Sequence, residues 1–271
     1  MKLVHLSDLH LGKDNNAADF ASIITHLNTT LDFDNHDYGI VITGDLIEDA
    51  SADQPFSKLK QLLTDLSPHF AGKVFLCPGN HDYGDFWGGH RDFIKTFRQE
   101  FADYLTGSND IPREDYENTE MAYPESPFPV VDIINDLVLI GLDSTAEELA
   151  DGYSLGAEGD IGERQRGCLD RLLELPEVRG RKVLVYLHHH PFKNRIILNK
   201  LRDAKEFMDV LEDRVDVLLF GHNHKYANCS SDSQPKGIHL ALEGGASTKD
   251  MRFRVIDMND LDCQEHSVPS E

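Results

Sequence analysis

Five short apolar runs in the sequence each end in a polar segment rich in Asp, Asn or His, and this pattern constrains the fold most. The runs are continuous and rich in Val, Ile and Leu, which is typical of buried strands. In open α/β sheets, ligands collect at the carboxyl edge of the strands. The pattern therefore predicts an α/β protein with a polar site at one sheet edge. The five polar segments are Ser7–His10, Gly44–Asp45, Gly79–Asp82, His188–His190 and Gly221–His224.

Amphipathic helices are predicted between several of the strands. Apolar residues recur at helical spacing over 20–31, 56–66, 169–173 and 207–211. Strand and helix alternation in the first half, and again over 162–220, predicts β-α-β units, whereas the runs over 130–142 and 238–256 predict hairpins. The polar tail after Asp257 is expected to fray. The predicted strands span 3–6, 40–43, 74–77, 130–134, 137–142, 183–187, 215–220, 238–242 and 253–256.

The stretch over residues 83–129 is the least regular part of the chain. Aromatic residues come first and a polar, acidic part with prolines follows, so we expect a helix and then a long surface loop that can act as a lid. We find no repeat and no linker, so residues 1–271 are expected to form one domain. Two further features can be either ordinary surface residues or contacts to an anionic substrate. They are His90 and the basic cluster Lys193, Arg195, Lys200 and Arg202.

Composition bounds the class of protein. The chain of 271 residues carries 48 acidic and 26 basic residues, a formal charge of −22, which argues against a nucleic-acid partner. It has no apolar stretch long enough for a membrane span and no signal-like start, so a cytoplasmic protein is expected. The four cysteines form no C-x-x-C pair, which gives no indication of a zinc knuckle or a disulfide framework.

The polar segments share the chemistry of a metal site. Carboxylate, amide oxygen and neutral imidazole suit Mn, Fe, Zn or Ni, and the number of candidate ligands exceeds what one ion takes. Two ions that share a bridging carboxylate, with a water or hydroxide between them, are the natural solution. In D-x-H and H-x-H, extended backbone is expected to put both ligands on one side, because alternate residues of a strand face the same way.

In this order, the motifs D-x-H, G-D, G-N-H-D, H-x-P and G-H-x-H resemble the calcineurin-like metallophosphoesterases, from Asp8 to His224. The opening HLSDLHLG and the stretch GLDST…GYSLGAEGDIGERQ are most similar to the small bacterial cyclic-nucleotide phosphodiesterase and glycerophosphodiesterase branch. The resemblance implies the metallo-dependent phosphatase fold, a four-layer α/β/β/α sandwich of two mixed sheets. The dinuclear site is then expected at one edge of the sheets.

The resemblance also implies roles for individual residues. Asp8, His10 and His224 are expected to bind one metal, Asn80 and His222 the other, and Asp45 to bridge the two. Manganese, iron or zinc, as two divalent ions or a mixed-valence pair, is the expected cofactor.

The remaining ligand comes from the three consecutive histidines. Alignment on Pro191 selects His189, whereas the position directly after the last apolar residue of the strand selects His188. We favour His189 as the ligand. Either adjacent histidine can then orient the ligand ring through a hydrogen bond to its other nitrogen.

The resemblance assigns contact with the substrate phosphate to His81, beside Asn80. His81 is expected to stabilise or protonate the leaving oxygen, which requires an acidic neighbour that holds up its pKa. Glu48 is a candidate for that neighbour, and equally a solvated glutamate at a helix start.

The expected function is a phosphodiesterase on small phosphoesters such as 3',5'-cyclic nucleotides, by in-line attack of a metal-bridging hydroxide. Two alternatives stay open, a metallonuclease of the DNA-repair type and a non-catalytic scaffold with the same fold. The acidic composition weighs against the first, and the presence of every matched position weighs against the second. No membrane partner is expected, and the sequence leaves the oligomeric state open, a homodimer included.

Overall fold

The computed structural model describes residues 1–84, 93–117, 126–145, 157–192 and 201–269, and its strands form two mixed sheets. In the first sheet, β1 (Lys2–Leu6), β2 (Tyr38–Thr43) and β3 (Val74–Cys77) run parallel. β10 (Arg252–Asp257) and β11 (Cys263–Ser267) complete it as antiparallel neighbours, in the order β11-β10-β1-β2-β3.

The second sheet has the order β4-β5-β6-β7-β9-β8 among the described residues. Its four inner strands run parallel, and both edge strands are antiparallel. The six strands are β4 (Val130–Ile134), β5 (Leu137–Gly141), β6 (Lys182–Tyr186), β7 (Val217–Phe220), β9 (Leu240–Gly244) and β8 (Tyr226–Asn228).

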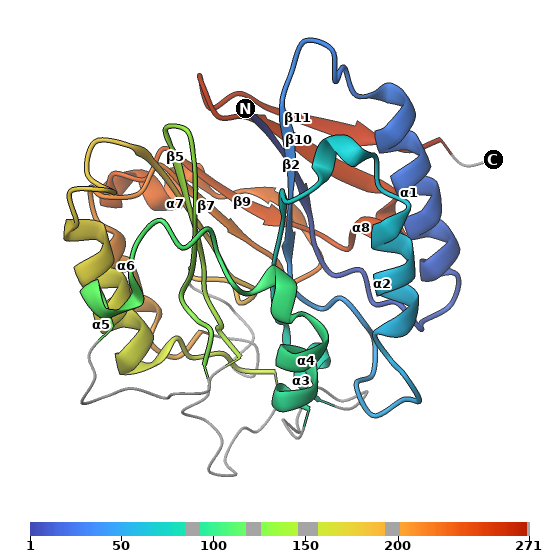
Figure 1. Ribbon diagram of the computed structural model, residues 1–271, viewed down its shortest axis with the longest axis horizontal. Helices are drawn as coiled ribbons and strands as arrows, with labels where there is room; N and C mark the ends of the chain where they lie inside the picture. The colour runs from blue at the N-terminus through green and yellow to red at the C-terminus, as the bar shows by residue number, and fades with distance from the viewer. Residues whose placement is uncertain (85–92, 118–125, 146–156, 193–200, 270–271) are drawn as a thin grey trace.

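Helices cover the outer face of each sheet, which gives the expected four layers (Figure 1). α1 (Asn16–Thr30) and α2 (Ser57–Thr64) lie on the side of the first sheet. α5 (Gly162–Glu174) and α6 (Ala204–Leu211) lie on the side of the second. The shorter helices are α3 (Asn80–Tyr83), α4 (Ile94–Glu100), α7 (Ser230–Ser233) and α8 (Ser247–Asp250). Short 3-10 turns span Pro68–Phe70, Ala102–Tyr104, Arg113–Asp115 and Gln234–Lys236.

Strand alternation divides the buried apolar residues into two cores. In β6, Leu184 and Tyr186 join the core between the sheets, whereas Val183 and Val185 join the core under α5 and α6. This is the period of two that a strand buried on both faces requires. The packed sheets therefore hold the carboxyl ends of β1, β2, β3, β6 and β7 in fixed positions.

Two sequence predictions about local structure are wrong. The run over 238–256 is not a hairpin, because β9 and β10 belong to different sheets and α8 lies between them. The tail after Asp257 does not fray, because β11 pairs with β10 and the ring of His266 stacks on Phe253 at 5.0 Å. The hairpin over 130–142 is present as β4 and β5.

The predicted lid lies partly outside the described residues, since 85–92 and 118–125 are not described. Its described part includes α4, where Phe97 and the following Phe101 are fully buried and both pack edge-on against the ring of Phe56. Within the described ranges, no helix combines the length and the apolar character of a membrane span.

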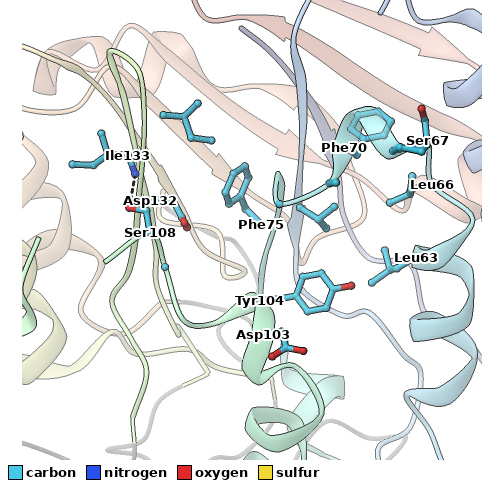
Figure 2. A pocket seen from close by; sticks show the side chains of 16 residues that line it. Leu63, Leu66, Ser67, Phe70, Phe75, Asp103, Tyr104, Ser108, Asp132 and Ile133 are labelled. Carbon is cyan, nitrogen blue, oxygen red and sulfur yellow. Dashed lines mark hydrogen bonds between the residues drawn. The ribbon is translucent and has the colours of Figure 1, made fainter. Parts of the chain in front are cut away.

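A cavity of about 700 Å³ lies between α2, the start of β3 and the end of β4, and none of the predicted site residues lines it. Figure 2 shows Asp132 of β4 among its lining side chains, with Tyr104 and Phe75. Burial, together with the nearby Asp110, raises the pKa of Asp132 to about 6. The charged carboxylate is therefore disfavoured in the folded chain.

Replacing Asp132 by Asn should stabilise the protein in a pH-dependent way. Because the folded pKa lies above the unfolded value, wild type loses stability as pH rises through this interval. The free energy of unfolding should rise in the variant by about 1–2 kcal/mol at pH 8 and by almost nothing at pH 4, measured by urea unfolding. An equal gain at both pH values would contradict the burial argument. Asp110→Asn, which removes only the neighbouring charge, is the control and should gain less.

Candidate dinuclear metal centre

The five polar segments converge at the carboxyl ends of the parallel strands. The first three segments follow β1, β2 and β3 of one sheet, and the other two follow β6 and β7 of the second. His222 N donates to the Asp8 carboxylate, and Gly221 N donates to the His188 carbonyl. Segments more than 200 residues apart in sequence are thus joined by hydrogen bonds across the two sheets.

The first group of metal-ligating atoms comprises Asp8, His10, Asp45 and His224, whose donor atoms all lie within 4.8 Å of one another. The Nε2 atoms of His10 and His224 are 3.0 Å apart. Asp8 Oδ1 lies 3.3 Å from His224 Nε2, and Asp45 Oδ2 lies 3.7 Å from His10 Nε2.

The second group comprises Asp45, Asn80, His188 and His222. His188 Nε2 lies nearest to the other members of this group, at 3.3 Å from Asp45 Oδ2 and 3.3 Å from Asn80 Oδ1. His222 Nδ1 lies 3.1 Å from the same nitrogen. Asp45, His188 and His222 are all buried.

Asp45 belongs to both groups, and its Oδ2 atom faces a histidine nitrogen of each. Two sets of imidazole and oxygen donors that share one carboxylate fit a pair of first-row divalent ions. Pairs of histidine nitrogens also face each other at 3.0 and 3.1 Å, and a cation would bind the lone pairs that point into this space. The residues present therefore fit a dinuclear centre.

The backbone at the proposed ligands is left-handed rather than extended. Asp8, His10, Asp45, His222 and His224 have φ values between 46° and 79°. The expectation that D-x-H and H-x-H use extended strand is therefore wrong, because β1 ends at Leu6 and β7 at Phe220, before either motif. Left-handed residues other than glycine are rare and cluster at functional sites, where packing holds them in place.

Glycine is required at Gly79 because the Asp45 segment passes directly beside it. A Cβ atom at this position would lie 2.2 Å from Asp45 Oδ1 and 2.3 Å from Asp45 N. The missing side chain allows the turn after β3 to touch the turn after β2, which brings Asn80 next to Asp45.

Hydrogen bonds distinguish His188 from His189. His188 Nδ1 lies 2.8 Å from the Thr43 carbonyl, which can only accept, so Nε2 keeps its lone pair for a metal. Ser144 Oγ accepts from the backbone N–H groups of both histidines and therefore donates its own proton to His189 Nδ1, at 2.9 Å. His189 then carries its proton on Nε2, the tautomer that cannot ligate through that atom. His188 Nε2 is grouped with donor atoms of Asp45, Asn80 and His222, so we propose His188 as the ligand where alignment on Pro191 favours His189.

His81 lies beside the first group, with its ring 4.9 Å from that of His10. Its backbone N–H donates to Asp45 Oδ1, and its Nδ1 atom lies 2.8 Å from the Glu48 carbonyl. That carbonyl accepts the Nδ1 proton, so the remaining ring nitrogen is left for a ligand or a substrate oxygen.

The Glu48 carboxylate contacts His10 directly and also lies within 4.8 Å of a ring nitrogen of His81. Its Oε2 atom lies 2.8 Å from His10 Nδ1, and its Oε1 atom accepts from Lys13 Nζ at 2.9 Å. Burial would raise the pKa of Glu48, but the contacts with His10 and Lys13 outweigh it and lower the pKa to about 2. A carboxylate behind a histidine is the usual arrangement that orients a metal ligand.

Replacing Glu48 by Gln should weaken metal binding at the first group by about 10- to 100-fold, because His10 loses the charge that orients its ring. Mn²⁺ titration followed by calorimetry measures the effect. Lys13→Met is the matched control, since it removes the other partner of Glu48 and leaves the contact with His10 in place. Unchanged Mn²⁺ affinity in Glu48→Gln would show that the carboxylate has no orienting role.

The charges of the carboxylates and imidazoles at the centre depend on one another. Burial disfavours a charged Asp45, but the imidazoles of His188 and His81 hold its pKa well below the usual range. Burial also disfavours a charged His188, but Asp45 and Asp8 raise the pKa of its ring to about 9. A cation held by these residues would replace the protons, so metal binding should release protons.

Sequence reasoning missed two residues that position the site. Ser144 follows β5 and fixes both histidines, and Asp82 is fully buried and accepts from the backbone N–H groups of Leu46, Ile47 and Gly79. Asp82 is visible as the last residue of G-N-H-D, and Ser144 as a polar residue after an apolar strand.

Other candidate residues lie away from the two groups or outside the described ranges. His90, Lys193, Arg195 and Lys200 lie outside the described residues. Arg202 donates to Glu158 Oε2 at 2.9 Å, so its charge is paired.

The fold and the paired groups define a two-sheet α/β protein with a candidate metal centre at the sheet edge, and comparison with known proteins agrees. The model of the calcineurin-like phosphoesterase family matches residues 1–226. The chain belongs to this family, which depends on a metal pair for phosphoester hydrolysis.

Solved structures share the fold at low sequence identity. A dimetal phosphatase from Danio rerio superposes with a TM-score of 0.59 at 14% identity, over 99% of each chain. A protein from Thermus thermophilus gives 0.58 at 12% identity, again over 99% of each chain. A protein described as a putative 5'-nucleotidase from Staphylococcus aureus gives 0.55 at 11% identity, over 100% of this chain and 54% of its own. No curated protein sequence matches the chain.

Proposed function

We propose that the protein hydrolyses small phosphodiesters, with 3',5'-cyclic nucleotides as one substrate class, at a dinuclear centre bridged by Asp45. The observation that carries the proposal is the position of Asp45 Oδ2 between the two groups of ligand atoms. Asp8, His10 and His224 form the rest of the first group. Asn80, His188 and His222 form the rest of the second.

When bound, the metal pair supplies a nucleophile at neutral pH and offsets the charge that builds up on the phosphoryl oxygens. The chain contributes orientation and proton control. Thr43 and Glu48 fix the tautomers of His188 and His10 through their Nδ1 atoms. His81, whose Nδ1 atom lies 2.8 Å from the Glu48 carbonyl, is the proposed group that stabilises the leaving oxygen, which requires a proton on its other ring nitrogen as well.

A phosphomonoesterase is the second candidate, because two of the fold neighbours are described as a phosphatase and a 5'-nucleotidase. The DNA-nuclease alternative is disfavoured by the net charge of −22, since a strong nucleic-acid binder needs a basic surface. The cytoplasmic location stays a prediction.

The proposal is tested by hydrolysis of bis-p-nitrophenyl phosphate, p-nitrophenyl phosphate and cyclic AMP, with the full chain loaded with Mn²⁺. Faster turnover of the diesters supports it, and faster turnover of the monoester makes the protein a phosphatase. No turnover of any ester by protein that holds two Mn²⁺ ions would favour the scaffold. Asp132→Asn, far from the centre, is the control and should retain wild-type turnover.

A further inference from the structure

A second cluster of metal-ligating side chains lies outside the dinuclear centre. His190 follows β6, Cys229 follows β8, and Glu243 lies in β9. His190 Nε2 is 3.7 Å from Glu243 Oε2 and 4.0 Å from Cys229 Sγ, and the three donor atoms all lie within 4.8 Å of one another. These residues come together only through the fold, because they are far apart in the sequence.

The cluster buries a carboxylate whose hydrogen-bonding capacity is not filled. Glu243 is 2% exposed, and its Oε1 atom has no hydrogen-bond partner in the described part of the chain. Cys229 is 8% exposed. Burial raises the pKa of Glu243 to about 7 and that of Cys229 to about 11, and it outweighs the opposing effects of the Lys225 charge on Glu243 and of the Arg254 charge on Cys229. A buried carboxylate oxygen with no hydrogen-bond partner is costly, and a bound cation would offset that cost.

The ring of His190 packs between two aromatic side chains, and one of its two tautomers suits a ligand. It packs edge-on against Phe220, with ring centroids 4.7 Å apart, and against Phe192 at 5.7 Å. Its Nδ1 atom lies 3.3 Å from the Phe192 carbonyl and 3.2 Å from the Phe192 amide nitrogen. The Phe192 backbone can therefore accept from Nδ1 or donate to it, depending on the tautomer of His190. When Nδ1 donates to the carbonyl, Nε2 directs a lone pair toward Cys229 and Glu243.

We propose that His190, Cys229 and Glu243 form a third cation site for a thiophilic divalent ion such as Zn²⁺. Thiolate, imidazole and carboxylate are zinc ligands, and tetrahedral zinc separates its nitrogen, oxygen and sulfur ligands by about 3.3–3.6 Å. The observed separations of 3.7 and 4.0 Å need only a small closure. Ion binding deprotonates the Cys229 thiol, and the proton leaves to solvent.

The bound ion would connect the segment after β6 to the β8–β9 edge of the second sheet. This third site stands independently of the proposed hydrolysis, because none of its ligands belongs to the dinuclear groups.

Cobalt titration tests the site, because a cobalt–thiolate bond gives a near-ultraviolet charge-transfer band and the proposed dinuclear ligands include no thiolate. In the reduced full chain, Co²⁺ should produce a band that saturates at one equivalent beyond the dinuclear pair. The band should vanish in Cys229→Ser and persist in the control Cys263→Ser. Wild type without the band, or Cys229→Ser with it, would overturn the proposal.

A second variant keeps the test decisive if the serine variant does not fold. Glu243→Gln keeps the size of the side chain and removes its charge, so Co²⁺ should bind to the thiolate about tenfold or more weakly. The band's titration midpoint measures this change, and an unmoved midpoint would exclude Glu243 as a ligand. Hydrolysis and the other two cobalt equivalents should survive in both variants, which separates failure of this site from failure of the proposed function.

Discussion

Asp45→Asn should lower diester turnover by a factor of about 10³ or more while the fold stays intact. An amide is neutral and bridges two cations poorly, so the centre loses charge stabilisation of about 4 kcal/mol or more. The Oδ2 atom that faces both His10 and His188 is the structural reason. Steady-state hydrolysis of bis-p-nitrophenyl phosphate, with metal content from mass spectrometry, measures both consequences.

Asp49→Asn is the matched control for this variant. It makes the same change four residues further along, where the carboxylate accepts from Ser51 N at 2.8 Å instead of facing the centre. Its turnover should equal that of wild type. Near wild-type turnover in a folded Asp45→Asn protein would refute the bridging role.

His188→Ala and His189→Ala should differ sharply although the two residues are adjacent and equally buried. The first variant should lose one of the two dinuclear ions and about 10³-fold in turnover, because His188 Nε2 faces Asp45 and Asn80. The second should keep both ions and lose about tenfold or less, because His189 is bonded to Ser144 instead.

Each histidine variant serves as the control for the other, since both delete one fully buried imidazole. Circular dichroism checks that both fold, and mass spectrometry counts the ions. If His189→Ala loses an ion and His188→Ala keeps both, alignment on Pro191 was the correct guide and the proposed ligand set must change.

The strand positions could be predicted because buried strands of this fold are continuous apolar runs. Nine runs match strands to within two residues at each end. β8 and β11 were missed because they are short or polar edge strands, whose stability comes from pairing and from contacts such as Arg254 with Glu265. The false hairpin at 238–256 arose because periodicity cannot show that a chain changes sheets.

The proposed site was predictable in outline, because the polar residues after each strand can be read directly from the sequence. The choice between His188 and His189 could not be predicted from the sequence. It depends on whether Nδ1 meets the Thr43 carbonyl or the Ser144 hydroxyl, and both partners are more than 40 residues away in sequence. The cluster of His190, Cys229 and Glu243 was invisible for the same reason, since spacing rules detect only ligands that are close in sequence.

Anomalous diffraction from a crystal of the full chain grown with Mn²⁺ tests the central claim most directly. We expect two manganese peaks about 3.5–4 Å apart on either side of Asp45. One should lie among Asp8, His10 and His224, and the other among Asn80, His188 and His222. A single peak, or two peaks that do not share Asp45, would contradict the dinuclear centre.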